Sequence, residues 1–199
     1  MTDFETVTAN LRKHGFAVSV FSAGEEAVRY LAEACRGKTV GLGGSTTAEQ
    51  LKLYPALTDT AEKVYWHLLD MSAETMLSAC EAPVYICGAN AVAETGEVLN
   101  IDGRGNRLAG TLMKKETVYL LAGRNKLAPD LTAALERARH IAARKNCVRL
   151  NKNTPCAHSD HCFDCSAAER ICNALLVLWR KPGWCERMEI VLIDEELGF

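Results

Sequence analysis

The chain has 199 residues, a formal net charge of −2 and a hydrophobic content of 48%. This length and apolar content suit one substantial core, so we expect a single domain over residues 1–199. The charge gives no basic surface for holding nucleic-acid phosphates, which favours a small ligand or a protein partner. The acidic start lacks the features of a signal peptide, and no apolar run reaches the roughly 18 residues of a spanning helix. We therefore expect a cytoplasmic protein without a membrane span.

The first half of the chain alternates between predicted strands and predicted helices. Phe4, Val7 and Leu11 have helical spacing, and Gly15 suits the end of that first helix. Alternation of this kind predicts an α/β fold with a mainly parallel sheet and helices on both faces. The predicted strands are residues 16–21, 39–42, 64–68 and 84–87, and the helices between them are residues 22–35, 48–53 and 72–80.

The second half departs from this alternation. Residues 97–102 and 107–112 flank the glycine-rich turn Gly103–Asn106, which favours an antiparallel hairpin added to the sheet. A further strand is predicted over residues 117–122, and a long helix over residues 129–146 opens with a proline. The last two predicted strands are residues 174–179 and 188–193.

A glycine-rich turn joins the second predicted strand to its helix. The turn contains Gly43, Gly44, Ser45, Thr46 and Thr47. Its N–H groups and hydroxyls can converge on a carboxylate or phosphate at the start of the helix, which makes these five residues candidates for ligand binding. The turn matches neither the dinucleotide fingerprint nor the P-loop, so a tight turn without a ligand is the alternative.

Further polar residues follow other predicted strands. Because the carboxyl ends of parallel strands meet at one edge of a sheet, we expect these residues to share a ligand site with the glycine turn. Taken singly, Asn and Asp are more common as turn formers. Our candidates for catalysis are Glu94, Asp102 and Lys126, and our candidates for ligand binding are Asn90 and Asn125.

Four of the nine cysteines lie in one polar segment, residues 154–173. Cys156, Cys162, Cys165 and Cys172 have the spacing C-x5-C-x2-C-x6-C. A metal would order a segment that has little apolar surface to bury. One C-x2-C unit with outlying cysteines favours a [4Fe-4S] cluster over zinc, whose sites usually join two close pairs. Zinc and four unrelated core cysteines are the alternatives. We expect the other five to be small buried side chains: Cys35, Cys80, Cys87, Cys147 and Cys185.

Several of these motifs together resemble the lactate-utilisation (LUD) domain family. The resemblance covers nearly the whole chain and implies a fold like that of ribose-5-phosphate isomerase and the CoA transferases. It also implies that residues Gly43 to Thr46 form the ligand loop. Larger members of the family join this domain to ferredoxin-like cluster domains, whereas this chain has only the cysteine motif. The matching motifs are Gly41–Thr46, Gly88–Ala91, Asn100–Arg107, Ala122–Lys126 and Thr154–Asn173.

The resemblance and the cysteine motif favour a subunit or accessory protein of an iron–sulfur-dependent system that oxidises lactate or a related small hydroxy acid. Such an oxidoreductase component would bind a small carboxylate or phosphorylated substrate. It would need an iron–sulfur or redox partner, because the sequence has no nicotinamide or flavin fingerprint. A homo-oligomer is compatible with these features. One alternative is a stand-alone isomerase or CoA-transferase-like enzyme with Glu94 as base or nucleophile, and another is a sensor or structural protein built on the metal cluster.

Overall fold

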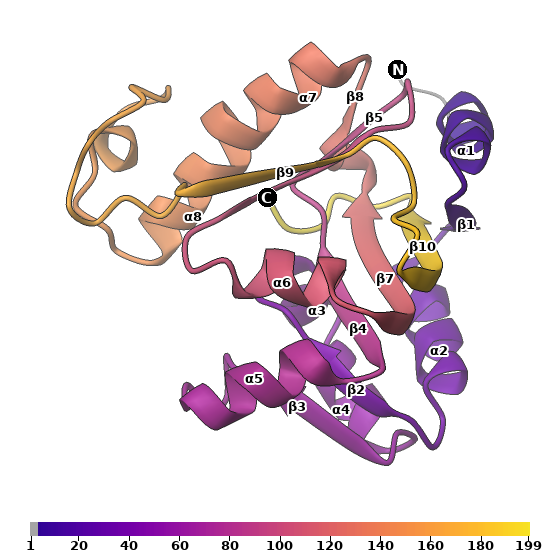
Figure 1. The fold of residues 1–199 in the computed structure, drawn as a ribbon. Coiled ribbons are helices and arrows are strands. Elements are labelled where there is room, and N and C mark those ends of the chain that lie inside the picture. Colours follow the sequence, from indigo (N-terminus) through magenta and orange to yellow (C-terminus); the bar gives the residue numbers. More distant parts are fainter. Residues whose placement is uncertain (1–3) are drawn as a thin grey trace.

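A parallel six-stranded sheet forms the centre of the protein, which a computed structural model describes over residues 4–199 (Figure 1). Its strand order is β1-β10-β7-β4-β2-β3, and every pairing is parallel. Residues 1–3 of the predicted domain lie outside the described residues. The strands are β1 (Ala17–Phe21), β2 (Thr39–Leu42), β3 (Lys63–Trp66), β4 (Val84–Gly88), β7 (Lys115–Gly123) and β10 (Cys185–Ile193).

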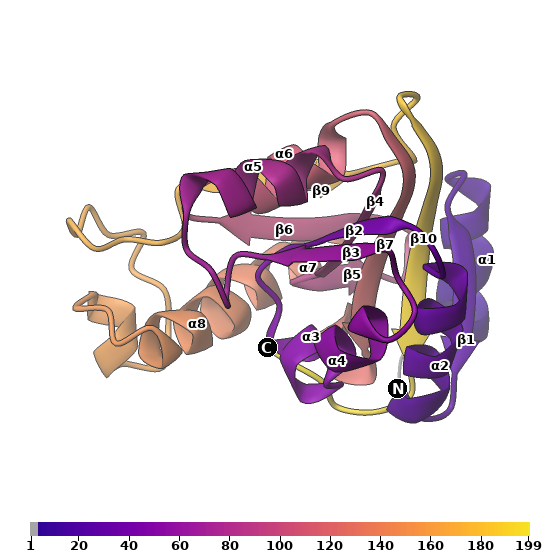
Figure 2. The ribbon, with the colours of Figure 1, turned by 90° about the horizontal axis from the view of Figure 1, so that it is seen from below.

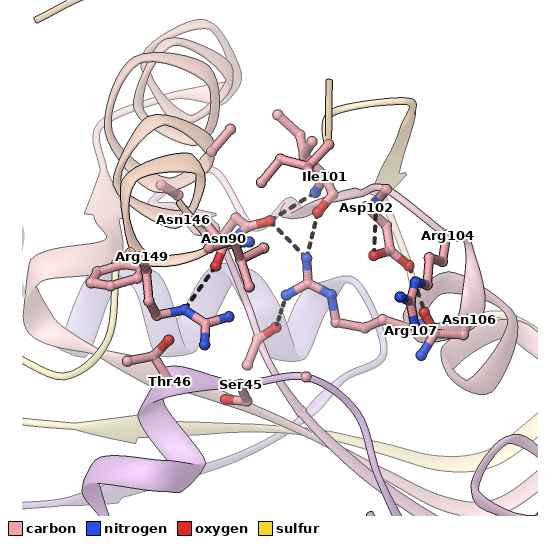
Figure 3. A pocket seen from close by; sticks show the side chains of 18 of the residues that line it. Ser45, Thr46, Asn90, Ile101, Asp102, Arg104, Asn106, Arg107, Asn146 and Arg149 are labelled. Carbon is pink, nitrogen blue, oxygen red and sulfur yellow. Dashed lines mark hydrogen bonds between the residues drawn. The ribbon is translucent and has the colours of Figure 1, made fainter. Parts of the chain in front are cut away.

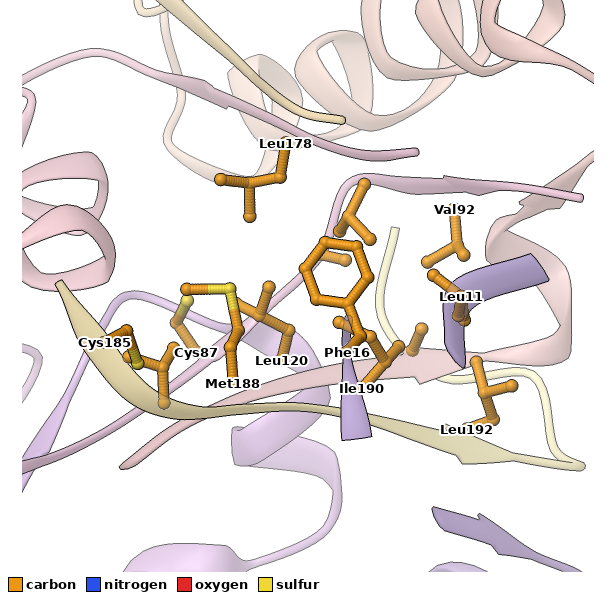
Figure 4. Close-up of a cluster of buried hydrophobic side chains, with 14 of the residues drawn as sticks. Leu11, Phe16, Cys87, Val92, Leu120, Leu178, Cys185, Met188, Ile190 and Leu192 are labelled. Atoms are coloured by element: carbon orange, nitrogen blue, oxygen red, sulfur yellow. The ribbon is translucent and has the colours of Figure 1, made fainter. Parts of the chain in front are cut away.

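A smaller, mixed sheet packs against the first, with the order β8-β5-β6-β9. Strand β6 pairs antiparallel with both β5 and β9, while β5 and β8 are parallel. The hydrophobic contact between the sheets includes Val92 and Leu178 from the small sheet and Leu120 and Ile190 from the large one (Figure 4). The strands of the small sheet are β5 (Ala91–Ala93), β6 (Val98–Asp102), β8 (Leu127–Ala128) and β9 (Ala174–Leu178).

The antiparallel hairpin is therefore present, but its second strand was predicted in the wrong place. Residues 107–112 belong to helix α6 (Asn106–Leu112), and the hairpin joins β5 to β6. The cause is local. The Asp102 carboxylate accepts the N–H groups of Gly103 and Arg107, both at 3.0 Å, and Gly105 takes φ +83°. These contacts start a helix at a point where the glycines suggested a strand reversal.

Helices cover both faces of the six-stranded sheet (Figures 1 and 2), as predicted. One face carries α2 (Gly24–Ala34), α3 (Thr46–Gln50) and α4 (Leu53–Thr58). The other carries α1 (Phe4–Lys13), α5 (Ala73–Glu81), α6 and the small sheet. Strand β4 shows the alternation that builds both layers, because Val84 and Ile86 enter one core while Tyr85 and Cys87 enter the other.

One long helical rod packs on the small sheet and then runs past it. It consists of α7 (Leu131–Arg137), the π-helical segment η2 (Ala138–Ala143) and α8 (Arg144–Arg149). The predicted helix over residues 129–146 is confirmed, although it begins after Asp130, whose side chain accepts the N–H of Ala133 at 2.8 Å. Two short 3-10 helices are η1 (Arg124–Lys126) and η3 (Pro155–His158).

Glycine allows the closest contact between a helix and the large sheet. A Cβ on Gly41 would overlap the backbone carbonyl of Ala79, so α5 can rest on β2 only where that strand has no side chain. None of the helices in residues 4–199 has the length and apolar character needed to cross a bilayer.

Candidate functional site

The parallel strands of the large sheet bring several loops together at one edge. Segments that follow β2, β3, β4 and β7 line a cavity of about 700 Å³ (Figure 3). Strand β6, helix α8 and part of the cysteine segment complete its wall. This edge, beyond the carboxyl ends of the strands, is where open α/β sheets bind ligands.

The predicted glycine turn lies at the cavity. Its residues Gly44 to Thr47 line the wall, whereas Gly43 lies beneath them and donates its N–H to Ile86 O at 2.9 Å. The Ser45 hydroxyl accepts the N–H of Ala48 at 3.1 Å and so caps α3. Helix α3 has only five residues, so its dipole adds little attraction for an anion. Any strong attraction must come from neighbouring side chains.

Lys126 lies at the floor of the cavity and is only 3% exposed. Its amine donates a hydrogen bond of 2.7 Å to the Thr47 hydroxyl. Burial, with smaller contributions from the positive charges of Arg137 and Arg107, lowers the pKa of this lysine from its usual 10.5 to about 7. The amine is therefore partly neutral near neutral pH.

Arg107 extends from α6 into the cavity (Figure 3). Its guanidinium donates to Gly88 O at 3.3 Å, to Asn90 Oδ1 at 3.2 Å and to Ile101 O. The Asn90 side chain also accepts the N–H of Ile101 at 2.8 Å. Asn90 thus positions Arg107. Its side-chain oxygen already accepts two hydrogen bonds and has little capacity to accept another from a ligand.

A third cation, Arg137, lies behind this group. It donates to Asn125 O at 2.7 Å and to Asn90 O, and burial lowers its pKa to about 10. Within residues 4–199, no carboxylate forms an ion pair with Lys126, Arg107 or Arg137. Cations with little access to water are normally paired, so the half-buried Arg107 and the buried Arg137 give this part of the protein positive charge that a bound anion would neutralise.

Asp102 lines the cavity, but its carboxylate is already occupied. One oxygen accepts from Gly103 and the other from Arg107, in both cases from the backbone. These two hydrogen bonds from N–H groups to the carboxylate organise the loop. This predicted catalytic residue therefore has a clear structural role.

Glu94 and Asn125 do not line the cavity. Glu94 lies in the turn between β5 and β6, where its N–H donates to Ala128 O and its carbonyl accepts from Asn10 in α1, both at 2.7 Å. The turn that contains Glu94 points away from the cavity, because the small sheet runs from the cavity edge toward α1. The Asn125 amide accepts from Leu197 N at 3.1 Å and donates to Gly198 O at 3.3 Å, which holds the segment after β10.

The sequence did not single out His67, which lines the cavity and is 9% exposed. Burial is the main cause that lowers the pKa of its imidazole, which favours the neutral form. The strand-end argument missed it because the predicted strand ran to residue 68, whereas β3 ends at Trp66 and His67 directly follows it. The other lining residues that sequence reasoning missed include Arg104, Arg107, Asn146 and Arg149. Arg149 comes from α8, which no strand-end argument could link to this edge.

Comparison with known proteins agrees with this fold. The profile of the LUD domain matches residues 4–193. The chain belongs to the LUD-domain family. A solved structure of a DUF162 family protein from Deinococcus radiodurans has a TM-score of 0.55 at 14% identity and covers 95% of this chain and 94% of that one. The likeness shows a shared fold.

A second solved structure aligns more weakly with the LUD domain. It is eIF2B beta from Chaetomium thermophilum, with a TM-score of 0.33 and 17% identity over 63% of this chain and 43% of that one. This similarity is too low to bear on fold or function. No curated protein sequence matches the chain.

The cysteine segment forms another part of the cavity wall in this LUD domain. Residues 168–171 and Asn173 line the cavity. Cys162 and Cys172 line an adjoining hollow of about 290 Å³, and Arg170 borders both spaces. The two spaces therefore share a wall.

The four predicted ligand cysteines lie in the same region without closing a site. Cys172 is close enough to Cys162 and Cys165 for their charges to add to burial in raising its pKa. Cys156 lies beside Cys147 of α8, whose pKa burial raises to about 11. In the described part of the chain, no three His, Cys, Asp or Glu side chains are arranged as metal ligands. The other five cysteines are buried, as predicted.

Proposed function

We propose that the cavity binds the carboxylate of a small 2-hydroxy or 2-oxo acid. In this proposal the protein is a subunit or accessory protein of an iron–sulfur-dependent system that oxidises lactate or a related acid. The observation that carries it is the pair of guanidinium groups, Arg107 and Arg137, beside the buried amine of Lys126, without an ion-paired carboxylate in residues 4–199. Membership of the LUD-domain family supports a substrate of this class.

Arg107 is the residue best placed to bind the carboxylate. A guanidinium has five N–H donors, and three of those of Arg107 are used by Gly88, Asn90 and Ile101. The two remaining donors, one on Nη1 and one on Nε, can each form a charge-assisted hydrogen bond with a carboxylate oxygen. Fixed partners hold the guanidinium before a ligand arrives, which lowers the entropy cost of binding.

We infer that His67 accepts the proton of the substrate hydroxyl. Its neutral imidazole lines the cavity, and the positive charges of Arg104 and Arg107 add to burial in keeping it unprotonated. Asp102 is the weaker candidate because both of its oxygens serve backbone N–H groups. A general base transfers protons most effectively when its pKa lies near the pH at which the enzyme works.

The cysteine segment would hold the redox centre in this proposal. Four thiols are a chemically suitable ligand set for a [4Fe-4S] cluster, which would supply one-electron transfer, and zinc is the structural alternative. Two of them, Cys162 and Cys172, face the hollow beside the cavity, where Arg139 donates to Cys162 Sγ at 3.8 Å. Closing the site requires Cys156 and Cys165 to move toward that hollow. Electrons would then leave through a redox partner.

Calorimetry of ligand binding tests the site. We expect wild-type protein to bind lactate and pyruvate but not lactamide, which has the same shape without the charge. Arg107→Gln should weaken binding by at least about tenfold, the size expected for one charge-assisted pair. Arg36→Gln, on an exposed arginine far from the cavity, is the control. Equal binding of lactate and lactamide would contradict the proposal.

Deletion of the gene in its own organism tests the wider role. Growth on lactate should fail or slow while growth on sugar continues. Unimpaired growth on lactate and related hydroxy acids, with no redundant gene, would remove the role in oxidation.

The volume of the cavity favours a second candidate function. About 700 Å³ is in the range of sites for ligands much larger than lactate. An isomerase or CoA-transferase-like enzyme acting on a phosphorylated or acyl-carrying substrate would use this space, and Arg149 and Lys152 at the rim could bind its further negative groups. Turnover of a phosphosugar or an acyl-CoA by metal-free protein would favour this candidate over the first.

A further inference from the structure

The amine of Lys126 lines the cavity at a point where the backbones of two glycines pass close to it. A Cβ on Gly88 would lie 3.5 Å from Nζ, and a Cβ on Gly198 would lie 3.2 Å from it. The Cβ on Gly88 would also meet the Ser45 hydroxyl at 2.7 Å. The lack of side chains on Gly88 and Gly198 therefore lets the amine pack close to the Ser45 and Thr47 hydroxyls at the cavity wall.

Burial, and then the positive charges of Arg137 and Arg107, favour a neutral Lys126 amine over an ammonium. The amine donates a hydrogen bond to the Thr47 hydroxyl, which is a neutral acceptor. A neutral, desolvated lysine beside other cations is a nucleophile near neutral pH. A lysine that served only to attract anions would gain from a more exposed, fully charged position.

Gly88 connects the amine to the proposed carboxylate site. Its carbonyl accepts from the Arg107 guanidinium at 3.3 Å, and its Cα side faces Lys126 Nζ. In a 2-oxo acid the carboxylate and the carbonyl are on adjacent carbons. A 2-oxo acid whose carboxylate is bound by Arg107 would therefore have its C2 carbonyl directed toward the lysine.

We propose that Lys126 forms a reversible imine with the C2 carbonyl of a 2-oxo acid held in the cavity. The Nζ–C2 bond forms, the carbonyl oxygen leaves as water together with both amine protons, and no atom changes its oxidation state overall. The Ser45 and Thr47 hydroxyls are placed to relay those protons. The inference rests on the proposed function in one respect, because the 2-oxo acid is the oxidation product of the 2-hydroxy acid assigned to this cavity.

Reductive trapping tests the imine. Full-length protein is incubated with pyruvate and sodium cyanoborohydride, and the modified peptides are mapped by mass spectrometry. We expect one stable adduct per chain, on Lys126, with a yield that rises with pH through about 7. Lys115 is an internal control, since it is 2% exposed but donates to the Cys80 carbonyl and does not line the cavity. Lys115 should remain unmodified.

The variant Lys126→Arg should lose the adduct completely while circular dichroism shows a folded protein. If that variant fails to fold, the peptide map of the wild type still shows whether Lys126 carries the adduct. An adduct on Lys115 or on exposed lysines alone, or no adduct at all, overturns the inference. Binding of pyruvate by wild type without an adduct would leave the carboxylate site standing and remove the imine. An adduct on Lys126 in protein that does not bind lactate would sustain the imine and remove the role in hydroxy-acid oxidation.

Discussion

The two walls of the cavity are built in different ways. The wall formed by the large sheet consists of short loops fixed at the ends of buried strands, and its polar side chains are hydrogen-bonded to backbone groups or to one another. The wall formed by the cysteine segment, residues 151–173, has no strand (Figure 1). Of these residues only Thr154 is buried.

Side-chain contacts hold the cysteine segment. Arg144 donates to Ser159 O at 2.8 Å, and Arg170 donates to Cys165 O at 2.5 Å and to Cys172 O at 3.0 Å. Such a segment opens more easily than a strand end, because it has few apolar contacts to lose. The sheet wall therefore presents a preformed surface, whereas the cysteine wall is held by a small number of side-chain contacts.

The largest effect should come from the sheet itself. Replacing Gly41 with Ala forces a methyl group into the backbone of α5, and we expect the free energy of unfolding to fall by more than about 3 kcal/mol. Urea denaturation measures this fall in the free energy of unfolding. Gly183→Ala is the matched control, because no atom lies within contact of a Cβ there. Equal stability of the two variants would contradict the fixed packing of α5 on β2.

Substitutions of two nearby arginines on the helical rod compare how firmly the two walls are held. Arg137→Ala leaves the carbonyls of Asn90 and Asn125 without their donor, and should lower the free energy of unfolding by about 2–3 kcal/mol. Arg139 instead contacts Asp164 at 3.6 Å in the cysteine wall, and Arg139→Ala should cost less than about 1 kcal/mol. Similar losses in both variants would mean that the walls are equally rigid.

The buried amine should make stability depend on pH. Because the pKa of Lys126 is about 7 in the folded protein and near 10.5 when unfolded, the unfolded chain binds more protons between these values. Stability should therefore rise with pH above about 7, by about 1–2 kcal/mol up to pH 8.5. Lys126→Met should remove this part of the dependence. A slope unchanged in Lys126→Met would show that the amine keeps its ordinary pKa.

Metal should change only the cysteine wall. Limited proteolysis of metal-free protein should cut first within residues 151–173, and reconstitution with iron and sulfide should slow that cut by at least about tenfold. Cys162→Ser should abolish the protection, whereas Cys35→Ser, in the opposite core, should retain it. Protection that survives in Cys162→Ser would exclude the four-cysteine centre.

The smallest change tests the preformed wall. A Cβ on Gly44 would make an ordinary contact with His67 Nε2 at 3.4 Å. Gly44→Ala should leave unfolding unchanged and weaken lactate binding by about threefold to tenfold, since the methyl group narrows the cavity. Affinity equal to that of the wild type would show that the ligand binds elsewhere.

The amino-acid sequence by itself determined the large sheet and the positions of the loops around the cavity. Alternating apolar runs identify buried strands, and parallel strands must place Ser45, Asn90 and Lys126 at one edge. The buried cysteines and the family followed from the same kind of local pattern. These features could be predicted because each depends on short stretches of chain.

Tertiary structure alone decided which side chains complete the site. Periodicity shows that a strand is buried but not which strand pairs with it, so the partner of β6 was misplaced and Glu94 was expected at the cavity edge. Arg107 reaches the cavity because Asp102 starts a helix, and Arg149 arrives on a rod from another part of the chain. The spacing of the four cysteines could not decide whether they form a metal site, because such a site also needs contacts between distant segments and a metal.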